Sequence, residues 1–259
     1  MLENDIEDEV EQKPRKLIFK WFFPILYKPR KSMDEIVQKD HAVWLAPLLV
    51  LMVTALVLVL VSAPLIGQSA QPATQPENFE YYSPDQQQQY QDAVNMGASP
   101  LVTMVFPYVG KLIGIWVGWI LLGSILHLSL TLNGSRSNIR TALNIVSWAS
   151  VPFILRDIVQ IIALLGTHQL ITQPGLSGFV ETGAGGFSSF LVALLTFFDL
   201  YLIWQVVLIG IGAMRISGIK AGNAWLATVI AVLIFLVIKA LPIFIAAQLK
   251  GLSPTGMFF

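Results

Sequence analysis

The sequence predicts an all-α fold: a polytopic membrane bundle of five transmembrane helices, with the N-terminus in the cytoplasm and the C-terminus outside. Composition is the first observation that predicts it, because 55% of the 259 residues are hydrophobic and only 12% are charged. Ordinary soluble domains have about 25% charged residues. The mean hydropathy is +0.67. The other two observations are five long apolar stretches and a one-sided distribution of Lys and Arg.

Five stretches have the length of about 20 apolar residues that a helix needs to cross the hydrocarbon core of a bilayer. Each must be helical, because lipid offers no hydrogen-bond partner to an open backbone. The third stretch is the least hydrophobic, because Arg156 and Asp157 lie side by side within it. The predicted spans cover residues 42–66, 107–132, 141–165, 188–214 and 223–248.

The distribution of Lys and Arg predicts the orientation, because cytoplasmic segments carry an excess of these residues. The segment before the first span holds eight of them, and the two loops after the second and fourth spans hold two each. The loops 67–100 and 166–187 hold none, and Lys250 alone lies beyond the last span. The N-terminus and both basic loops are therefore predicted to be cytoplasmic.

The residues before the first span divide into two parts. Residues 1–12 are acidic, and we expect them to be a disordered tail. Residues 13–41 are a basic segment with a short helix, and the aromatic and aliphatic stretch Leu17–Tyr27 lies within it. We expect this segment to lie in the headgroup layer with its cations against anionic lipid; the alternative is that it packs on the cytoplasmic end of the bundle. The flanking basic residues are Lys13, Arg15, Lys16, Lys20, Lys28, Arg30 and Lys31.

Helix-capping patterns predict two helix starts outside the spans. Ser32 followed by Glu35 has the spacing of a capping box, which predicts a helix leading into the first span. Ser83 followed by Pro84 predicts a second start, and Gly97 a stop, so a short surface helix is expected in the long outer loop. Residues 249–259 are expected to be a C-terminal tail.

A glycine stripe marks the second span. Gly110, Gly114 and Gly118 recur at steps of four, a spacing that lets a neighbouring helix approach closely. We expect these helix-packing glycines to contact a helix of the same chain. Association with a second copy is the alternative, so a homo-oligomer remains open.

The most unusual feature is a set of charged side chains within the spans. These are Arg156, Asp157, Asp199 and Lys239, with Lys111 near the outer end of its span. One charge at the bilayer centre costs about 2.5–3.5 kcal/mol even on the lenient insertion scale. Four or five unpaired charges would cost on the order of ten kcal/mol or more, which is comparable to the stability of a whole domain. We therefore expect these groups to pair or to face water.

Their depths favour pairing, because at about 1.5 Å per residue the first four reach similar levels in the middle-to-outer half of the membrane. We expect Asp157 and Asp199 to be shared among Arg156, Lys239 and, as a further candidate, Lys111. Arg156 and Asp157 are adjacent on one helix, so they face different neighbours. The favoured interpretation is a buried ion network that fixes helix register. The alternative is a polar conduit or binding pocket.

Catalytic and metal-binding patterns are missing from the sequence. The chain has no cysteine, which excludes disulfides and thiolate metal ligands. His127 stands alone on an apolar helix, where an interhelical hydrogen bond is a better expectation than metal ligation. Basic and acidic residues number sixteen each, so net charge gives no reason to expect a nucleic-acid partner. We predict no enzyme activity, no metal and no cofactor.

Three runs of sequence carry a family resemblance. They are "ILYKPRKSMDEIVQKDHAVWLAPLLVL" before and into the first span, "NGSRSNIRTALNIVSWASVPFIL" after the second, and "FFDLYLIWQVVLIGIGAMRISGIKAGNAW" in the fourth. From about Leu17 to Ala246 the chain resembles the Yip1-domain membrane proteins, in their bacterial branch. The resemblance implies a multi-pass helical protein without known catalysis. Eukaryotic relatives act in vesicle traffic with small GTPases and reticulon-like partners, but no "DLYGP"-like motif precedes the first span here.

These observations predict an integral membrane scaffold or adaptor of Yip1 type, which acts through helix and lipid contacts in membrane organisation or trafficking. Its expected location is the cell (cytoplasmic) membrane. Its expected partners are the bilayer and its anionic lipid headgroups, with a membrane-protein partner or a second copy as further candidates. The alternative function is a small transporter or channel component that uses the buried charges as a polar pathway.

Overall fold

A computed structural model describes residues 17–39, 41–71, 75–76, 78–180 and 187–252. These residues form an all-helical bundle, and no strand occurs among them. The three short elements are η1 (Phe79–Tyr81), the π-helical turn η2 (Leu101–Val105) and η3 (Ser177–Phe179). The ten α-helices of the described part are α1 (Pro24–Tyr27), α2 (Pro29–Val37), α3 (Leu45–Ser69), α4 (Pro84–Ala98), α5 (Phe106–Leu132), α6 (Ile139–Trp148), α7 (Val151–Thr167), α8 (Phe187–Leu195), α9 (Leu200–Ile216) and α10 (Ala221–Leu252).

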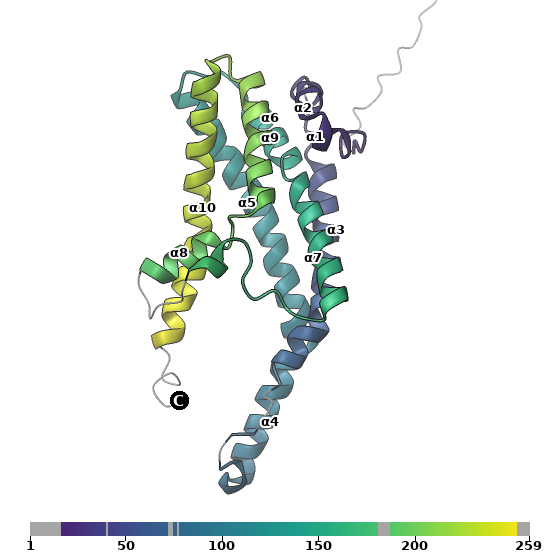
Figure 1. The fold of residues 1–259 in the computed structure, drawn as a ribbon, viewed down its shortest axis with the longest axis vertical. Helices are drawn as coiled ribbons and strands as arrows, with labels where there is room; N and C mark the ends of the chain where they lie inside the picture. Colours follow the sequence, from purple (N-terminus) through teal and green to yellow (C-terminus); the bar gives the residue numbers. More distant parts are fainter. Residues whose placement is uncertain (1–16, 40, 72–74, 77, 181–186, 253–259) are drawn as a thin grey trace, which may run out of the picture.

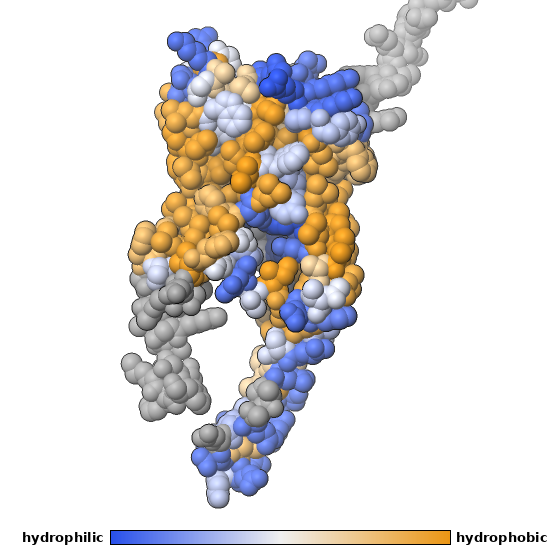
Figure 2. Space-filling model, in the orientation of Figure 1, coloured by the Kyte–Doolittle hydropathy of each residue, from blue (hydrophilic) through white to orange (hydrophobic). Residues whose placement is uncertain are grey.

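Four continuous helical stretches are long and apolar enough to cross a membrane, and a bent pair of helices adds a fifth if the pair forms one span. The four are Leu45–Ser69, Pro84–Leu132, Ile139–Thr167 and Ala221–Ile245. Figure 2 shows an apolar surface over the middle of the bundle and hydrophilic surface at both ends. The prediction of an all-α, multi-pass membrane protein is therefore confirmed.

The predicted span 188–214 is not one straight helix. It consists of α8 and α9, which are bent by 71° relative to each other, and α8 lies across the bundle in Figure 1. The break falls at Asp199, whose extended backbone (φ −139°, ψ 175°) caps the start of α9. With 17 residues, α9 is about 25 Å long, shorter than the hydrocarbon core of about 30 Å.

A glycine from the preceding loop holds this break in place. Gly175 has a φ of +63°, a conformation that residues with a Cβ rarely adopt. A Cβ added to Gly175 would lie within 2.9 Å of the carbonyl oxygens of Leu195, Thr196 and Phe198. The next residue, Leu176, donates its backbone N–H to the Leu195 carbonyl at 3.0 Å. Only a glycine fits this closely against the end of α8.

The segments predicted to be cytoplasmic gather at one end of the bundle, which we call the basic end. It carries α1, α2, the α5–α6 turn and the α9–α10 turn (Figure 1). Arg215 at the end of α9 forms an ion pair with Asp34 of α2 at 2.9 Å. The other end, called here the opposite end, carries α4, which continues through η2 into α5 as one helical stretch.

The two predicted helix starts have different outcomes. Ser83 and Gln86 form a capping box at the start of α4, which confirms the expected surface helix. The predicted start at Ser32 is wrong, because α2 begins at Pro29 and Ser32 is buried within it. Glu35 instead accepts hydrogen bonds from Lys20 Nζ at 2.8 Å and from Trp21 Nε1 at 2.9 Å.

The N-terminal segment from Leu17 to Val37 packs on the basic end with one face and leaves the other exposed. Its bundle-facing side chains are almost completely buried, namely Trp21, Ile25, Met33 and Ile36. The Trp21 ring meets that of Trp148 edge-on, with centroids 5.2 Å apart. Phe19, Phe23 and Tyr27 are 58%, 80% and 65% exposed. Packing on the bundle, which the sequence offered as the alternative, therefore accounts for one face of this segment only. Lys13, Arg15 and Lys16 lie outside the described residues, as does the predicted tail 1–12. The predicted C-terminal tail 249–259 starts too early, because α10 continues to Leu252, and its remaining residues are not described.

Asn144 joins α6 to the segment that enters the first span. The residue is fully buried, and its Oδ1 accepts a hydrogen bond from Val43 N at 3.0 Å while its Nδ2 donates to the His41 carbonyl at 3.1 Å. Trp148 Nε1 donates to the Val43 carbonyl at 3.0 Å. These three bonds satisfy backbone groups of a non-helical stretch inside the protein, where an unpaired group is costly.

The close helix contacts occur at glycines that the sequence prediction did not select. A Cβ added to Gly210 would lie 2.5 Å from the Trp225 ring, and one added to Gly212 would lie 2.7 Å from Ile145 Cγ2. Both glycines are on α9 and bring it against α10 and α6. Their spacing of two differs from the i, i+4 spacing of the stripe in the second span.

Candidate functional site: a charged cavity in the bundle

A cavity of about 740 Å³ lies within the bundle. Its walls come from α3, α5, α6, α7, α9 and α10, together with the loop before α8 and the break between α8 and α9. Figure 2 shows a recess with hydrophilic surface in the middle of an otherwise apolar face. Four of the five predicted in-span charges line the cavity, namely Lys111, Arg156, Asp157 and Lys239. The expectation that all of them are buried is wrong, because only Asp157 is buried and both lysines are exposed on the cavity wall.

Arg156 and Asp157 follow each other on α7 and point to different neighbours, as their spacing predicts. Asp157 is 3% exposed, and its Oδ2 accepts a hydrogen bond from the Thr54 hydroxyl of α3 at 3.1 Å. Arg156 Nη1 lies 3.6 Å from Asp199 Oδ2, and its Nε lies 3.9 Å from Asp157 Oδ1. The guanidinium also stacks over the Phe153 ring at 4.6 Å. Arg156 therefore links both carboxylates.

The N···O distances from Arg156 to Asp199 and Asp157 are too long for hydrogen bonds. Charge-assisted N–H···O bonds are usually about 2.7–2.9 Å, whereas the two distances here are 3.6 and 3.9 Å. The Nε of Arg156 is buried without a hydrogen-bond acceptor among the described residues. The guanidinium has five N–H donors, so most of its donor capacity is not used by these two carboxylates.

Asp199 has a second, structural role. Its Oδ1 accepts a hydrogen bond from Leu202 N at 2.7 Å, which caps the first turn of α9. The start of a helix carries unpaired N–H groups and a partial positive charge, both of which favour a carboxylate. The break in the fourth span thus orients the carboxylate and turns its other oxygen toward Arg156.

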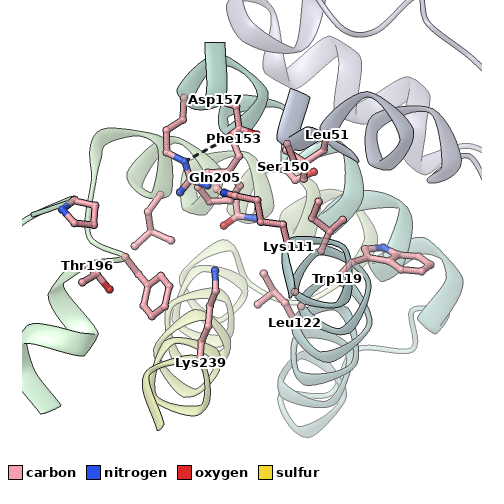
Figure 3. Close-up of a pocket in the computed structure, with 18 of the residues that line it drawn as sticks. Leu51, Lys111, Trp119, Leu122, Ser150, Phe153, Asp157, Thr196, Gln205 and Lys239 are labelled. Carbon is pink, nitrogen blue, oxygen red and sulfur yellow. Dashed lines mark ion pairs between the residues drawn. The ribbon is translucent and has the colours of Figure 1, made fainter. Parts of the chain in front are cut away.

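We expected Lys239, and Lys111 as a further candidate, to form ion pairs with Asp157 and Asp199. The structure shows no such ion pair among the described residues. Neither ammonium lies within 4.0 Å of a carboxylate among the described residues. Lys239 Nζ instead lies 4.4 Å from the Phe197 ring and 5.8 Å from the Phe235 ring. Figure 3 shows both lysines extending from α5 and α10 into the same space.

Neutral polar side chains complete the wall, and sequence reasoning missed them. Gln205 is only 5% exposed, lines the cavity, and makes no hydrogen bond to any residue in the described part of the chain. Ser150 and Thr196 also line it, but their hydroxyls donate to the Ser147 and Ala193 carbonyls. A glutamine within an apolar span is a weak sequence signal. It gains meaning here because α9 directs it toward Lys111 and Lys239 (Figure 3).

The glycine stripe borders this cavity. A Cβ added to Gly110 or Gly114 would meet nothing within 4 Å, whereas one at Gly118 would lie 3.4 Å from the Phe235 ring. All three line the cavity. Within this chain, then, the first two glycines leave open space, and only Gly118 lies close to a neighbouring helix.

No group of three or more His, Cys, Asp or Glu side chains that could hold a metal occurs in the described ranges. His127, expected to make an interhelical hydrogen bond, has a buried Nδ1 with no partner among these residues. Fully buried apolar side chains fill the bundle between the cavity and the basic end, including Leu126, Leu130, Ile145, Leu208 and Ile209.

Comparison with known proteins identifies one family. The Yip1 domain matches residues 23–241, which is most of the chain. No curated protein matches. No solved structure matches either.

Proposed function

The chain belongs to the Yip1 domain family, and from this membership and its docked N-terminal segment we propose that it is a membrane scaffold or adaptor that acts through lipid and helix contacts. Yip1 domain proteins are generally non-enzymatic membrane proteins, and we propose a non-catalytic role here as well. We place the protein in the cell membrane, as a member of the bacterial branch, with the basic end in the cytoplasm.

One observation carries this proposal: the N-terminal segment is fixed on the bundle and exposes an aromatic and basic face. Trp21, Ile25 and Ile36 anchor it against the bundle. Phe23 and Tyr27 are exposed on its other side. Exposed aromatic rings with neighbouring cations are typical of segments that lie in the headgroup layer of anionic membranes.

The basic residues of this face act at the level of the lipid headgroups in our proposal. Lys28, Arg30 and Lys31 are exposed around the start of α2. Each basic residue close to an anionic surface contributes about 1 kcal/mol of attraction. Because the segment is held by the bundle, it would organise acidic lipid around a fixed site, which is the property of a scaffold. A second membrane protein or a second copy could share that surface.

Spin-labelled lipids in reconstituted vesicles test the proposal. We expect the wild-type protein to immobilise acidic phospholipid several-fold more than neutral phospholipid. A variant with Lys28→Gln, Arg30→Gln and Lys31→Gln should lose most of this preference. The matched control carries Arg136→Gln and Lys220→Gln, which remove exposed cations from the two basic turns; it should keep the preference. Equal immobilisation of both lipids by the wild type would contradict the proposal.

The cavity supports a second candidate, a small transporter or channel component. Its charged lining is what such a protein would need, but the buried apolar layer between the cavity and the basic end disfavours a conduit. Flux of small ions and solutes through proteoliposomes separates the two functions. The scaffold proposal expects no flux above protein-free vesicles, whereas flux that depends on Asp199 in an Asp199→Asn comparison would favour the transporter.

A further inference from the structure

We propose that the cavity binds an amphiphilic anion, in which a phosphate or carboxylate group carries an apolar chain. This site is separate from the N-terminal segment, so the inference does not depend on the scaffold role. The argument rests on the charges, the hydrogen-bonding capacity and the apolar part of the cavity wall.

The charges around the cavity leave a surplus of cations. Three are present, Lys111, Arg156 and Lys239, against the two carboxylates of Asp157 and Asp199. Arg156 lies within 4.0 Å of both carboxylates, and the two lysines reach neither. The lysines stand on α5 and α10, which pack against each other, and point into one space (Figure 3). One anion between them would neutralise the surplus.

The hydrogen-bonding groups of the wall also favour an anion. The carboxylates already have partners, because Asp157 accepts from Thr54 and Asp199 accepts from the backbone of α9. Lys239 and Arg156 retain N–H donors, and the amide of Gln205, which lines the cavity, has no partner among the described residues. One oxygen of each carboxylate is already bonded, and lysine and arginine carry donors only, so spare donors outnumber free acceptors in this wall, which suits phosphate or carboxylate oxygens. It is not suited to a cation.

The remaining wall is apolar and suits a hydrocarbon chain. Trp119, Leu122, Phe235 and Ile243 also line the cavity. Gly114 leaves open space on α5, since no neighbouring atom lies within 4 Å of its ideal Cβ position. The volume of about 740 Å³ lies within the range of about 300–1,000 Å³ for small-molecule sites. A free inorganic anion would leave most of this space and its apolar wall unused.

The absence of cysteine from the sequence allows a direct test. A Gly114→Cys variant places a single thiol in the cavity, and Gly166→Cys places one in open space at the opposite end, outside the cavity lining. The two variants are treated in detergent with thiosulfonate reagents of matched size, one anionic and one cationic. After normalisation to Gly166→Cys, we expect the anionic reagent to react with Cys at 114 at least about fivefold faster. One net positive charge about 8 Å from the thiol gives that ratio in a medium as polar as water, because it attracts the anionic reagent and repels the cationic reagent by equal amounts.

Lipid occupancy forms the second arm. Gly114→Cys protein is placed in nanodiscs of neutral phospholipid alone, with an added acidic phospholipid, or with inorganic phosphate in the buffer. A neutral maleimide then reports whether position 114 is covered. We expect the acidic phospholipid to slow labelling several-fold and inorganic phosphate to leave it unchanged. The combined Lys111→Gln and Lys239→Gln variant should abolish this protection.

The outcomes separate the alternatives. Protection by inorganic phosphate without protection by acidic lipid would overturn an amphiphilic ligand. Faster labelling by the cationic reagent, or no protection in any disc, would overturn an anion site altogether. The reagent ratio is measured with both lysines present, so the test stands even where the double variant does not fold. None of these results depends on the lipid preference of the N-terminal segment.

Discussion

Replacing Asp199 separates two roles of its carboxylate: one oxygen caps α9 and the other faces Arg156. Asparagine is about as good an N-cap as aspartate, so Asp199→Asn removes the charge and keeps the cap. Asp199→Ala removes both. The pair of variants therefore measures the ion pair and the cap separately.

The geometry sets the size of each effect. Truncating one partner of a fully buried ion pair costs about 3–5 kcal/mol, and an exposed pair is worth about 0–1 kcal/mol. The side chains of Arg156 and Asp199 are 30% and 18% exposed, their distance is 3.6 Å, and Arg156 keeps Asp157 at 3.9 Å. We therefore expect Asp199→Asn to cost about 1–2 kcal/mol. Asp199→Ala should cost about 1 kcal/mol more, because the cap is also lost.

Thermal unfolding of the detergent-purified protein is the assay. One kcal/mol corresponds to about 2–4 °C in Tm for a chain of this size. Asp92→Asn, on the exposed surface of α4, is the control and should leave Tm unchanged. Equal losses for Asp199→Asn and Asp199→Ala would refute the capping role. No loss in Asp199→Asn would refute the ion pair as a contribution to stability.

Three further predictions concern a close helix contact, a buried hydrogen-bonding side chain and a titratable group. Gly212→Ala should destabilise the protein by about 1–3 kcal/mol through overpacking, whereas Gly114→Ala, in open space, should be neutral or stabilise it by up to about 1 kcal/mol; equal Tm shifts would contradict this. Asn144→Ala leaves the buried Val43 N–H and the partly buried His41 carbonyl without partners and should cost about 2–4 kcal/mol in unfolding, while exposed Asn95→Ala should have little effect. The pKa of Glu35 lies below its ordinary value of 4.5 because of its hydrogen bonds to Lys20 and to the indole N–H of Trp21; a lowered pKa stabilises the fold above 4.5, and this contribution is lost as the pH falls through the folded-state value. The wild type should therefore be more stable than Glu35→Gln at pH 7, by less than about 1 kcal/mol for so exposed a pair, and a Tm difference that does not shrink as the pH is lowered below 4.5 would contradict this assignment.

The sequence predicted the spans and their basic side because both depend on local composition. Residues 42–66 carry no charge and residues 223–248 carry only Lys239, so their helices follow from length and hydropathy alone. The adjacency of Arg156 and Asp157 also predicted correctly that they face different neighbours. These inferences need only the helical period and the cost of charge in lipid.

The break at Asp199 and the cavity required tertiary information. The break depends on Gly175, which lies outside the span and contacts the end of α8 only in the folded chain. The glycine stripe shows the same limit, since its spacing permits close approach but does not say whether a helix fills the space. Gly114 faces a cavity, and Gly212, without the i, i+4 spacing, holds two helices together. Likewise, equal depth along separate helices did not bring Lys239 into contact with a carboxylate.

The broken fourth span connects the fold to the chemistry of the cavity. A continuous helix at Asp199 would pair the backbone N–H groups internally and leave none for its carboxylate. Starting α9 at Leu200 instead gives the carboxylate a backbone partner and directs the partial positive charge of the helix start toward the cavity. The positive potential of the cavity therefore has a backbone component besides Lys111 and Lys239. Neutralising both lysines leaves Arg156 and about half a charge from the helix start against the two carboxylates, so position 114 should lose its preference for the anionic reagent, and an unchanged preference would show that other groups set the potential.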